Sequence, residues 1–258
     1  KAIHMPYGFL LVTGPTGSGK STTLYATLAE ISSDDKNTIT LEDPVERRMA
    51  GINQVQMNNR AGMTFAAALR SVLRSDPDIV MVGEIRDGET AKIAVEAALT
   101  GHMVLSTLHT NDAPGAVTRL NEMGVEPFLV TSSLVGVLAQ RLVRRLCPKC
   151  KEAYQIKRDD LLKIFPDLPL DEYPDEEFTL YKPKGCITCN NTGYKGREAV
   201  FEFLTVTEEM KELILDRANA AAIKELAIKQ GMHTLKDEGI YKVMHGKTSI
   251  EEILRVIV

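Results

Sequence analysis

The sequence contains 258 residues, of which 44% are hydrophobic, 26% charged and 5% aromatic, with a formal net charge of −4. These values exclude intrinsic disorder and collagen-like repeats, and they argue against a dedicated nucleic-acid binder, which is usually strongly basic or rich in stacking aromatic residues. Because the longest apolar runs fall far short of the ~20 residues of a membrane-spanning helix and no signal-peptide pattern opens the sequence, we expect a soluble intracellular enzyme or interaction module.

A phosphate-binding loop follows the first predicted strand. The apolar residues 9–13 predict a buried strand, and residues 22–29 have helical spacing. Between them, GPTGSGKS completes the pattern G-x-x-x-x-G-K-[ST] in the strand–loop–helix context that it requires. In this pattern backbone N–H groups cradle phosphates, Lys20 reaches the β and γ phosphates, and the Ser21 hydroxyl binds Mg²⁺. The candidate nucleotide-binding residues are Gly14, Pro15, Thr16, Gly17, Ser18, Gly19, Lys20, Ser21 and Thr22.

The second predicted strand ends in a group of carboxylates. Residues 38–41 form the strand, and Glu42, Asp43 and Glu46 follow it. Three acids at one strand end repel one another unless a cation or water compensates for their charge. Glu42 and Glu46 are therefore candidate catalytic residues, and the alternative is that one or two of the three acids cap or pair with neighbouring groups.

A third strand ends in a single acid. Residues 79–82 are four consecutive apolar residues, and Glu84 follows them. A hydrophobic strand that ends in an acid is typical of a Walker B element, whose carboxylate lies near Mg²⁺ or the attacking water. Gly83 stands where the metal-binding Asp is normally found, so Glu84 acts alone or shares its work with the acids of residues 42–46.

Polar residues follow the next strand, at residues 103–107. Ligands of an α/β sheet bind at its carboxyl edge, where His109 and its neighbour Thr110 are expected to lie. His109 could there hydrogen-bond the γ-phosphate and sense its loss. The alternative is a structural histidine, which is the more common role of a lone His.

Helical periodicity recurs around these strands. Alternating strands and helices favour a largely parallel, right-handed α/β sheet. After a strand at residues 199–204, the chain is predicted to be helical from Thr207, with breaks at Asn219, Gly231 and Gly246. The other helices are predicted at residues 64–73, 89–99, 113–123 and 127–141.

All four cysteines fall into two C-x-x-C pairs. Each pair can place two thiolates on one cation, so the two pairs can close a tetrahedral zinc site. A disulfide is disfavoured in the cytosol, and a redox C-x-x-C needs only one pair. The stretch between the pairs has room for a small helix at residues 160–165. We expect Zn²⁺ to be bound by Cys147, Cys150, Cys186 and Cys189.

Charge is unevenly distributed after the core. Residues 141–151 carry five basic residues and no acid, whereas residues 159–177 carry eight acids and one Lys. The two segments could dock one subunit on the next, or the basic one could face a membrane-bound protein or an anionic ligand. The alternative is a solvated face that supports zinc-bound thiolates. Likewise Arg70, Arg74 and Arg86 either stabilise phosphate charge or pair with carboxylates.

Four ordered segments resemble one known family. GPTGSGKSTTLYA, TLEDPVE, DPDIVMVGEIRD and TGHMVLSTLHTNDA resemble the Walker A motif, Asp box, atypical Walker B motif and His box of the secretion ATPase superfamily, which drives type II secretion and type IV pili. The matching blocks span about residues 9–120, and similarity continues at residues 193–197 and 246–252. The resemblance implies a hexameric, Mg²⁺-dependent ATPase with Glu84 in the Walker B role, Glu42 to Glu46 as the Asp box and His109 in the His box.

The resemblance also implies an organisation and partners. We expect a RecA-like ATPase core at residues 1–145, a tetracysteine metal-binding subdomain at 146–200 and a C-terminal helical subdomain at 201–258. In the family a tetracysteine element marks the pilus-assembly and type II secretion enzymes, whereas retraction ATPases lack it. The implied cofactors are ATP, Mg²⁺ and Zn²⁺. The resemblance implies that the full-length protein forms a homo-hexamer and acts on an inner-membrane platform protein. No nucleic-acid partner is expected, and the implied location is the cytoplasmic side of the inner membrane.

Two further expectations concern the length and the alternatives. Family members carry N-terminal domains before the core, associated with adenine contacts and catalytic arginines, so this chain is expected to be part of a longer protein. Alone it should bind ATP more weakly and hydrolyse it far more slowly than the full-length enzyme, and we expect it to be monomeric in solution. A RecA-type DNA translocase and a regulatory module that binds nucleotide without turnover are the alternatives; DNA-stimulated hydrolysis would favour the first, and the absence of phosphate release would favour the second.

Overall fold

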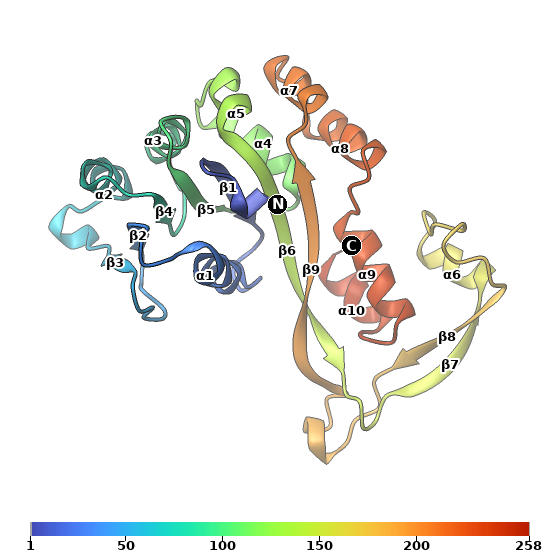
Figure 1. Ribbon diagram of the computed structural model, residues 1–258. Coiled ribbons are helices and arrows are strands. Elements are labelled where there is room, and N and C mark those ends of the chain that lie inside the picture. The colour runs from blue at the N-terminus through green and yellow to red at the C-terminus, as the bar shows by residue number, and fades with distance from the viewer. Residues whose placement is uncertain (1, 258) are drawn as a thin grey trace. The chain divides into compact units, whose positions relative to one another are not determined.

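A seven-stranded sheet in the order β3-β2-β4-β5-β1-β6-β9 is the main feature of the computed structural model, which describes residues 2–257 (Figure 1). The pairs β1–β5, β1–β6, β2–β3, β2–β4 and β4–β5 are parallel. β1, β2, β4 and β5 are buried along their whole length, which is why they appear in the sequence as apolar runs without alternation. The strands are β1 Gly8–Thr13, β2 Thr38–Glu42, β3 Asn53–Gln56, β4 Ile79–Val82, β5 Met103–Leu108, β6 Leu134–Leu146 and β9 Tyr194–Thr205.

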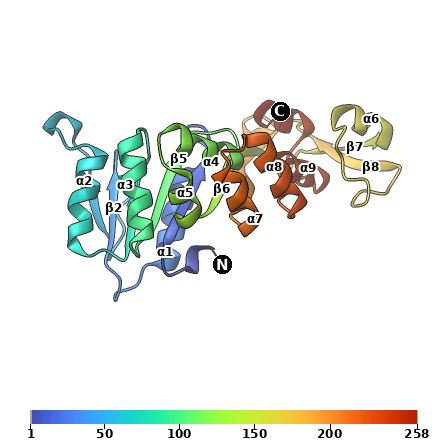
Figure 2. The same ribbon diagram turned by 90° about the horizontal axis from the view of Figure 1, so that it is seen from above.

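The order of the strands determines which helices cover each face. The chain passes from β1 through α1 to β2, and it passes from β4 through α3 to β5 in the opposite direction along the sheet. Because such crossovers are right-handed, α1 lies on one face and α3 on the other, as Figure 1 shows. In Figure 2, α2, α3 and α5 form a row along the sheet. These helices are α1 Lys20–Ile31, α2 Phe65–Val72, α3 Gly88–Leu99, α4 Ala113–Glu122 and α5 Pro127–Ser133.

The residues group into two units. The first comprises residues 1–140 and 203–232, and the second comprises residues 141–202 and 233–258. β6 and β9 contribute residues to both units. The first unit also contains α7 Glu208–Leu215 and α8 Ala220–Lys229. The three-part division at residues 145 and 200 stays a prediction.

The second unit contains an antiparallel hairpin and three helices. β7 Glu152–Lys157 pairs with β8 Glu177–Lys182, and the small helix expected at residues 160–165 is confirmed as α6 Arg158–Ile164. Leu161, Phe165 and Leu180 are buried in this unit. Its other helices are α9 Leu235–Met244 and α10 Ile250–Val256. Across both units, the short 3-10 turns are Ala2–His4, Asn59–Ala61, Leu73–Ser75 and Ile187–Cys189.

Most helices begin at a side-chain cap that the sequence signals. Thr207, Asn219 and Ser249 accept hydrogen bonds from backbone N–H groups three residues later. The helix start predicted at Thr207 and the break predicted at Asn219 are confirmed. Asp87 and Asp112 cap α3 and α4 in the same way. The expected α/β fold, with its mainly parallel sheet and C-terminal helices, is confirmed.

One predicted helix is wrong over half its length. Residues 127–141 were expected to be helical, but α5 ends at Ser133 and β6 begins at Leu134. β6 pairs with β1 in the middle of the sheet, and most of residues 134–140 are buried there. An apolar run that is buried on both faces has no period of two, so its spacing also fits a helix.

Among residues 2–257, none of the helices combines the length and the apolar character that crossing a membrane requires.

Candidate functional site

The phosphate-binding loop joins β1 to α1 at the carboxyl edge of the sheet. Gly14, Gly17 and Gly19 have φ angles of 146°, 78° and 90°, which residues with side chains rarely adopt. Glycine at these positions lets the loop curl tightly between the strand and the helix. Lys20 Nζ donates hydrogen bonds to the carbonyl oxygens of Gly14 at 2.8 Å and Pro15 at 3.1 Å. The predicted strand–loop–helix arrangement is therefore present.

Gln140 supports this loop, and the sequence analysis did not single it out. Gln140 lies on β6 with 2% of its surface exposed. Its Nε2 donates to the Ser18 carbonyl at 2.7 Å, and its Oε1 accepts from Thr23 Oγ1 at 2.6 Å. It is 122 residues away from Ser18 in sequence, so no local signal could have identified it. Ser18 is also buried, and its Oγ has no hydrogen-bond partner among the described residues.

Glu84 lies just beyond β4, next to the end of β5. Its side chain is 17% exposed; the carboxylate forms an ion pair with Arg86, and Glu84 Oε2 lies 3.7 Å from His109 Nε2. The hydrogen bond from Arg86 to Glu84 raises the pKa of the Arg86 guanidinium. The structure thus brings together the Walker B candidate and the His-box candidate. Their catalytic roles stay predictions.

Gly83 is required by the close approach of β4 to β2. A Cβ atom at this position would lie 3.1 Å from the Leu41 carbonyl oxygen and 3.5 Å from Glu42 Cα. The Gly83 N–H donates to the Leu41 carbonyl at 2.8 Å. A side chain at this position would therefore crowd the backbone of β2, which favours Gly at the atypical Walker B ending.

Glu42 is buried, and both of its oxygens are hydrogen-bonded. Oε2 accepts from the Tyr25 hydroxyl, and Oε1 accepts from Thr40 Oγ1 at 2.5 Å and Gln54 Nε2 at 3.1 Å. Burial and the bond to Glu42 raise the pKa of Tyr25, so its hydroxyl stays a donor. Three neutral donors satisfy this carboxylate without a cation. The arrangement favours a structural role for Glu42, and its catalytic role stays a prediction.

Glu46 differs from Glu42 because it is exposed and faces the phosphate-binding loop. Glu46 Oε1 accepts a hydrogen bond from Ser21 Oγ at 3.1 Å. Ser21 is the hydroxyl that the motif assigns to Mg²⁺. Of the two candidate acids in the Asp box, Glu46 is the one that contacts this hydroxyl.

Hydroxyl groups fix the carboxyl ends of the central strands to one another. Thr13 Oγ1 on β1 lies 2.7 Å from Thr110 Oγ1 and accepts from the Thr110 N–H at 2.9 Å. Ser106 Oγ donates to the Val82 carbonyl at 2.7 Å, and Thr107 Oγ1 donates to the Gly83 carbonyl at 2.8 Å. These bonds therefore fix the ends of β1, β4 and β5 relative to one another. β1 leads into the phosphate-binding loop, Glu84 follows β4, and His109 follows β5.

The candidate arginines contact protein groups. Arg70 forms an ion pair with Glu89 at 2.7 Å, Arg74 donates to the Arg70 carbonyl at 3.2 Å, and Arg86 is paired with Glu84. For Arg70 and Arg86 these contacts favour the second of the two alternatives left by the sequence, pairing with carboxylates, whereas Arg74 bonds a backbone carbonyl.

The four cysteines form one cluster in the second unit. Their sulfur atoms all lie within 4.8 Å of one another. The Sγ–Sγ distances are 3.9 Å for Cys147–Cys186, 3.7 Å for Cys150–Cys189 and 3.7 Å for Cys186–Cys189. A disulfide requires about 2.05 Å, whereas two thiolates on a tetrahedral Zn²⁺ with Zn–S bonds of about 2.3 Å lie about 3.8 Å apart. The cluster therefore has the spacing of a metal site.

Backbone N–H groups stabilise negative charge on this cluster. The N–H groups of Cys186 and Gly193 donate to Cys189 Sγ at 3.2 and 3.3 Å. Although burial raises the pKa of the Cys189 thiol, these two bonds, together with the side chains of Cys150 and Cys186, lower it to about 6. Burial raises the pKa of Cys150 to about 12. Thiolates in such a cluster need a cation to compensate their combined charge.

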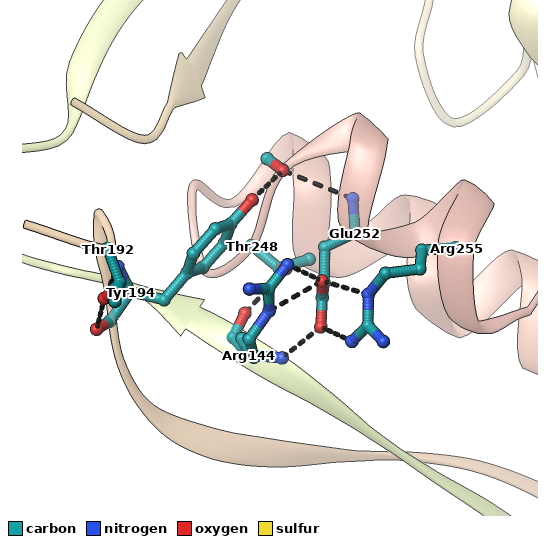
Figure 3. Close-up of polar contacts among 7 residues, drawn as sticks. Arg144, Thr192, Tyr194, Thr248, Glu252 and Arg255 are labelled. Carbon is teal, nitrogen blue, oxygen red and sulfur yellow. Dashed lines mark hydrogen bonds and ion pairs between the residues drawn. The ribbon is translucent and has the colours of Figure 1, made fainter. Parts of the chain in front are cut away.

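A buried carboxylate links the strands on either side of the cysteines to α10 (Figure 3). Glu252 is fully buried and accepts hydrogen bonds from the Arg144 guanidinium at 2.7 and 2.9 Å and from the Arg255 guanidinium at 2.6 and 2.9 Å. The Tyr194 hydroxyl lies 2.7 Å from Ser249 Oγ, and Arg144 stacks over the Tyr194 ring at 4.1 Å. We call Arg144, Tyr194, Ser249, Glu252 and Arg255 the Glu252 network.

The Glu252 network contacts the chain on both sides of the segment 147–189, which contains the four cysteines. Arg144 lies three residues before Cys147, and Tyr194 lies five residues after Cys189. Although burial raises the pKa of Glu252, its bonds to Arg255 and Arg144 lower it to about 2. Arg144 of the basic segment 141–151 is therefore engaged within its own unit.

Comparison with protein families gives one match over almost the whole chain. Residues 1–255 match the family described as "Type II/IV secretion system protein". The chain is 55% identical over 254 residues to the type IV pilus assembly ATPase PilB of Thermus thermophilus, covering 98% of the chain and 28% of the relative. It is 54% identical over 256 residues to the type II secretion system ATPase E of Vibrio cholerae, covering 99% of the chain and 50% of the relative. The chain thus spans half or less of the length of these relatives.

A solved structure also shares the fold. The crystal structure of the pilus retraction motor PilT with bound ADP superposes with a TM-score of 0.70 at 26% identity, over 98% of this chain and 62% of that one. The likeness covers both units of the present chain.

Proposed function

The chain belongs to the type II/IV secretion system protein family, and from this membership we propose that it is the ATP-hydrolysing part of a motor for type IV pilus assembly or type II protein secretion. The observation that carries the proposal is the phosphate-binding loop with carboxylates from two neighbouring strand ends. Glu46 contacts Ser21 of the loop, and Glu84 follows β4. The names of both relatives support an ATPase.

Each candidate residue has a proposed role in hydrolysis. The N–H groups of residues 14–22 and Lys20 bind the phosphates, and Ser21 is the protein ligand of Mg²⁺. When bound, Mg²⁺ neutralises charge on the β- and γ-phosphate oxygens. Glu84 orients or deprotonates the attacking water, and His109, 3.7 Å from Glu84, responds to the γ-phosphate.

Zinc is the proposed metal of the cysteine cluster. Four sulfur ligands favour Zn²⁺ or an iron–sulfur cluster, and the distances of 3.7–3.9 Å match the edge of a ZnS₄ tetrahedron. A site with four protein ligands has no open position for a substrate. The proposed role of zinc is therefore structural, joining residues 147–150 to residues 186–189.

The proposed assembly is a homo-hexamer that acts on an inner-membrane platform protein from the cytoplasmic side. The support is family membership and the structural likeness to PilT, the pilus retraction motor described above. The identities of 55% and 54% favour neither pilus assembly nor type II secretion.

Substitution of Glu84 tests the proposed function. Glu84→Gln keeps the shape of the side chain but removes its charge and basicity, so phosphate release in the presence of Mg²⁺ should fall at least about 100-fold. The affinity for an ATP analogue should stay within about threefold, because Glu84 is not part of the phosphate-binding loop. Single-turnover phosphate release and analogue titration measure the two quantities.

Glu96→Gln is the matched control, because Glu96 is exposed on α3. It should retain the rate of the unaltered chain. Full turnover by Glu84→Gln would contradict the assignment of Glu84, and absence of nucleotide binding by the unaltered chain would contradict the proposed function itself.

A further inference from the structure

Tyr25 connects the helix of the phosphate-binding loop to the Asp box. It lies on α1 four residues after Ser21, so both side chains share one face of the helix. Its ring is 9% exposed and packs in the cluster that contains Leu10, Leu24 and Leu28. A tyrosine in this environment needs partners for its hydroxyl group.

The Tyr25 hydroxyl has three partners, two in the Asp box and one at Arg47, the residue that follows it. It donates to Glu42 Oε2, and it accepts from the backbone N–H groups of Glu46 at 3.2 Å and Arg47 at 3.3 Å. A phenol has one donor and two acceptor sites, so its capacity is used completely. The hydroxyl therefore fixes the backbone on which Glu46 stands.

Two glutamines of β3 also bond the backbone of residues 45–47. Gln54 Nε2 donates to the Arg47 carbonyl at 2.8 Å, and Gln56 Oε1 accepts from the Val45 N–H at 2.8 Å. Together with Tyr25 these bonds leave residues 45–47 few alternative positions. The Glu46 carboxylate, at the end of this fixed backbone, contacts Ser21 Oγ at 3.1 Å.

We propose that Tyr25 is a positioning residue that holds Glu46 opposite Ser21 and thereby sets the affinity of the nucleotide site for Mg²⁺. The inference rests on the proposed function, because Ser21 is taken as the protein ligand of the metal. α1 then supplies both the metal-binding hydroxyl and the anchor of the facing carboxylate. Glu42 is the partner that orients the phenol.

The test is the Mg²⁺ dependence of nucleotide binding in Tyr25→Phe. This change removes one oxygen atom and keeps the ring in its packed place. Loss of a partner that orients a metal-binding group typically weakens metal affinity 10–100-fold, so the Mg²⁺ concentration that gives half of the maximal analogue affinity should rise at least about tenfold. Affinity measured in EDTA should change less than about twofold, because the loop and Lys20 are unchanged.

Two further variants separate positioning from a general structural effect. Glu46→Gln should shift the Mg²⁺ requirement as Tyr25→Phe does, and the double variant should shift it no further, because both changes act on one interaction. Tyr241→Phe, at a tyrosine that is 48% exposed on α9, should leave it unchanged.

The outcomes are distinct. An unaltered Mg²⁺ requirement in Tyr25→Phe or in Glu46→Gln overturns the inference while the proposed function stands, and so do additive shifts in the double variant. If Tyr25→Phe weakens analogue binding equally with Mg²⁺ and in EDTA, the inference is also overturned, because that result indicates a general disturbance of the phosphate-binding loop. Absence of nucleotide binding by the unaltered chain instead defeats the proposed function.

Discussion

At the scale of single residues, the surroundings of each acid decide what it can do. Glu42 and Glu46 belong to the same short motif, yet Glu42 is buried with three neutral donors and Glu46 is exposed beside Ser21. A carboxylate whose oxygens are already hydrogen-bonded has little capacity left for a metal or a water molecule. Glu84 is intermediate, because Arg86 pairs with its carboxylate while its Oε2 lies 3.7 Å from His109 Nε2.

Gly83→Asp should destabilise the chain rather than improve hydrolysis. The added side chain would begin 3.1 Å from the Leu41 carbonyl, and its charge would approach Glu42. We expect a loss of about 1–3 kcal/mol in the free energy of unfolding, as for other overpacked sites, and phosphate release no faster than in the unaltered chain. Urea unfolding and phosphate release measure these two effects.

Gly83→Ala is the control that separates crowding from charge. It should cost less than Gly83→Asp, since it adds the Cβ atom without the carboxylate. Faster hydrolysis and unchanged stability in Gly83→Asp would contradict this prediction, because they would show that the backbone of β2 can shift to make room for the side chain.

At the scale of elements, the Glu252 network joins parts of the second unit that are far apart in sequence. Thr248 Oγ1 donates to the Arg144 carbonyl at 2.8 Å, and the Leu146 N–H donates to the Lys247 carbonyl at 2.9 Å. The segment before α10 is thus bonded to the end of β6, next to Cys147. The chain next to Cys147 is therefore fixed by these bonds as well as by the cysteine cluster.

Glu252→Gln should destabilise the second unit in a pH-dependent manner. The pKa of Glu252 is lowered to about 2 in the folded chain, below its ordinary value, so its contribution is complete above that ordinary value and is lost as the pH falls toward 2. A lowering of this size corresponds to about 3 kcal/mol at pH 7. Urea unfolding at pH 7, 5 and 3 should show the difference from the unaltered chain shrinking as the pH decreases.

The neighbouring Glu251→Gln is the control, because Glu251 is exposed. It should change the free energy of unfolding by less than about 0.5 kcal/mol. A difference between Glu252→Gln and the unaltered chain that stayed constant from pH 7 to pH 3 would show that the carboxylate charge is not the source of the stability.

At the scale of the whole molecule, the two units carry different chemistry. The phosphate-binding loop, Glu46, Glu84 and His109 belong to the first unit, whereas the four cysteines and the Glu252 network belong to the second. Each unit has buried hydrophobic residues of its own, such as Leu105 in the first and Phe165 in the second. Metal removal should therefore affect the two units unequally.

Cys186→Ser should abolish zinc binding with little effect on nucleotide affinity. We expect about one zinc per unaltered chain and none in the variant, because a structural site uses all four ligands. The melting temperature of the second unit should fall, whereas analogue affinity should stay within about twofold. Metal analysis, calorimetry and analogue titration measure the three quantities.

Thr188→Ser, in the same turn between two cysteines, is the matched control and should retain the metal. The zinc assignment would be contradicted by zinc-free unaltered protein that unfolds at the same temperature with and without added zinc.

The sequence by itself determined the features that depend on local order. The phosphate-binding loop, the acid-ending strands, the helix caps and the two C-x-x-C pairs are each encoded within about a dozen neighbouring residues. The resulting α/β fold was predictable, since alternating strands and helices pack in few ways. The cysteine cluster was predictable as well, because two pairs of thiolates have one common use in such a chain.

Only the tertiary structure decided the features that depend on contacts between distant residues. It distinguished the roles of Glu42 and Glu46, because Glu42 is bonded to the buried Tyr25 hydroxyl. It showed that the backbone of β2 crowds the position of Gly83. It placed Gln140 beside the phosphate-binding loop. It also showed β6 where helical spacing had predicted a helix, since burial on both faces removes the periodicity that distinguishes the two. Hydrogen bonds and packing between segments up to 122 residues apart leave no periodic trace in the sequence, which is why these assignments required the fold.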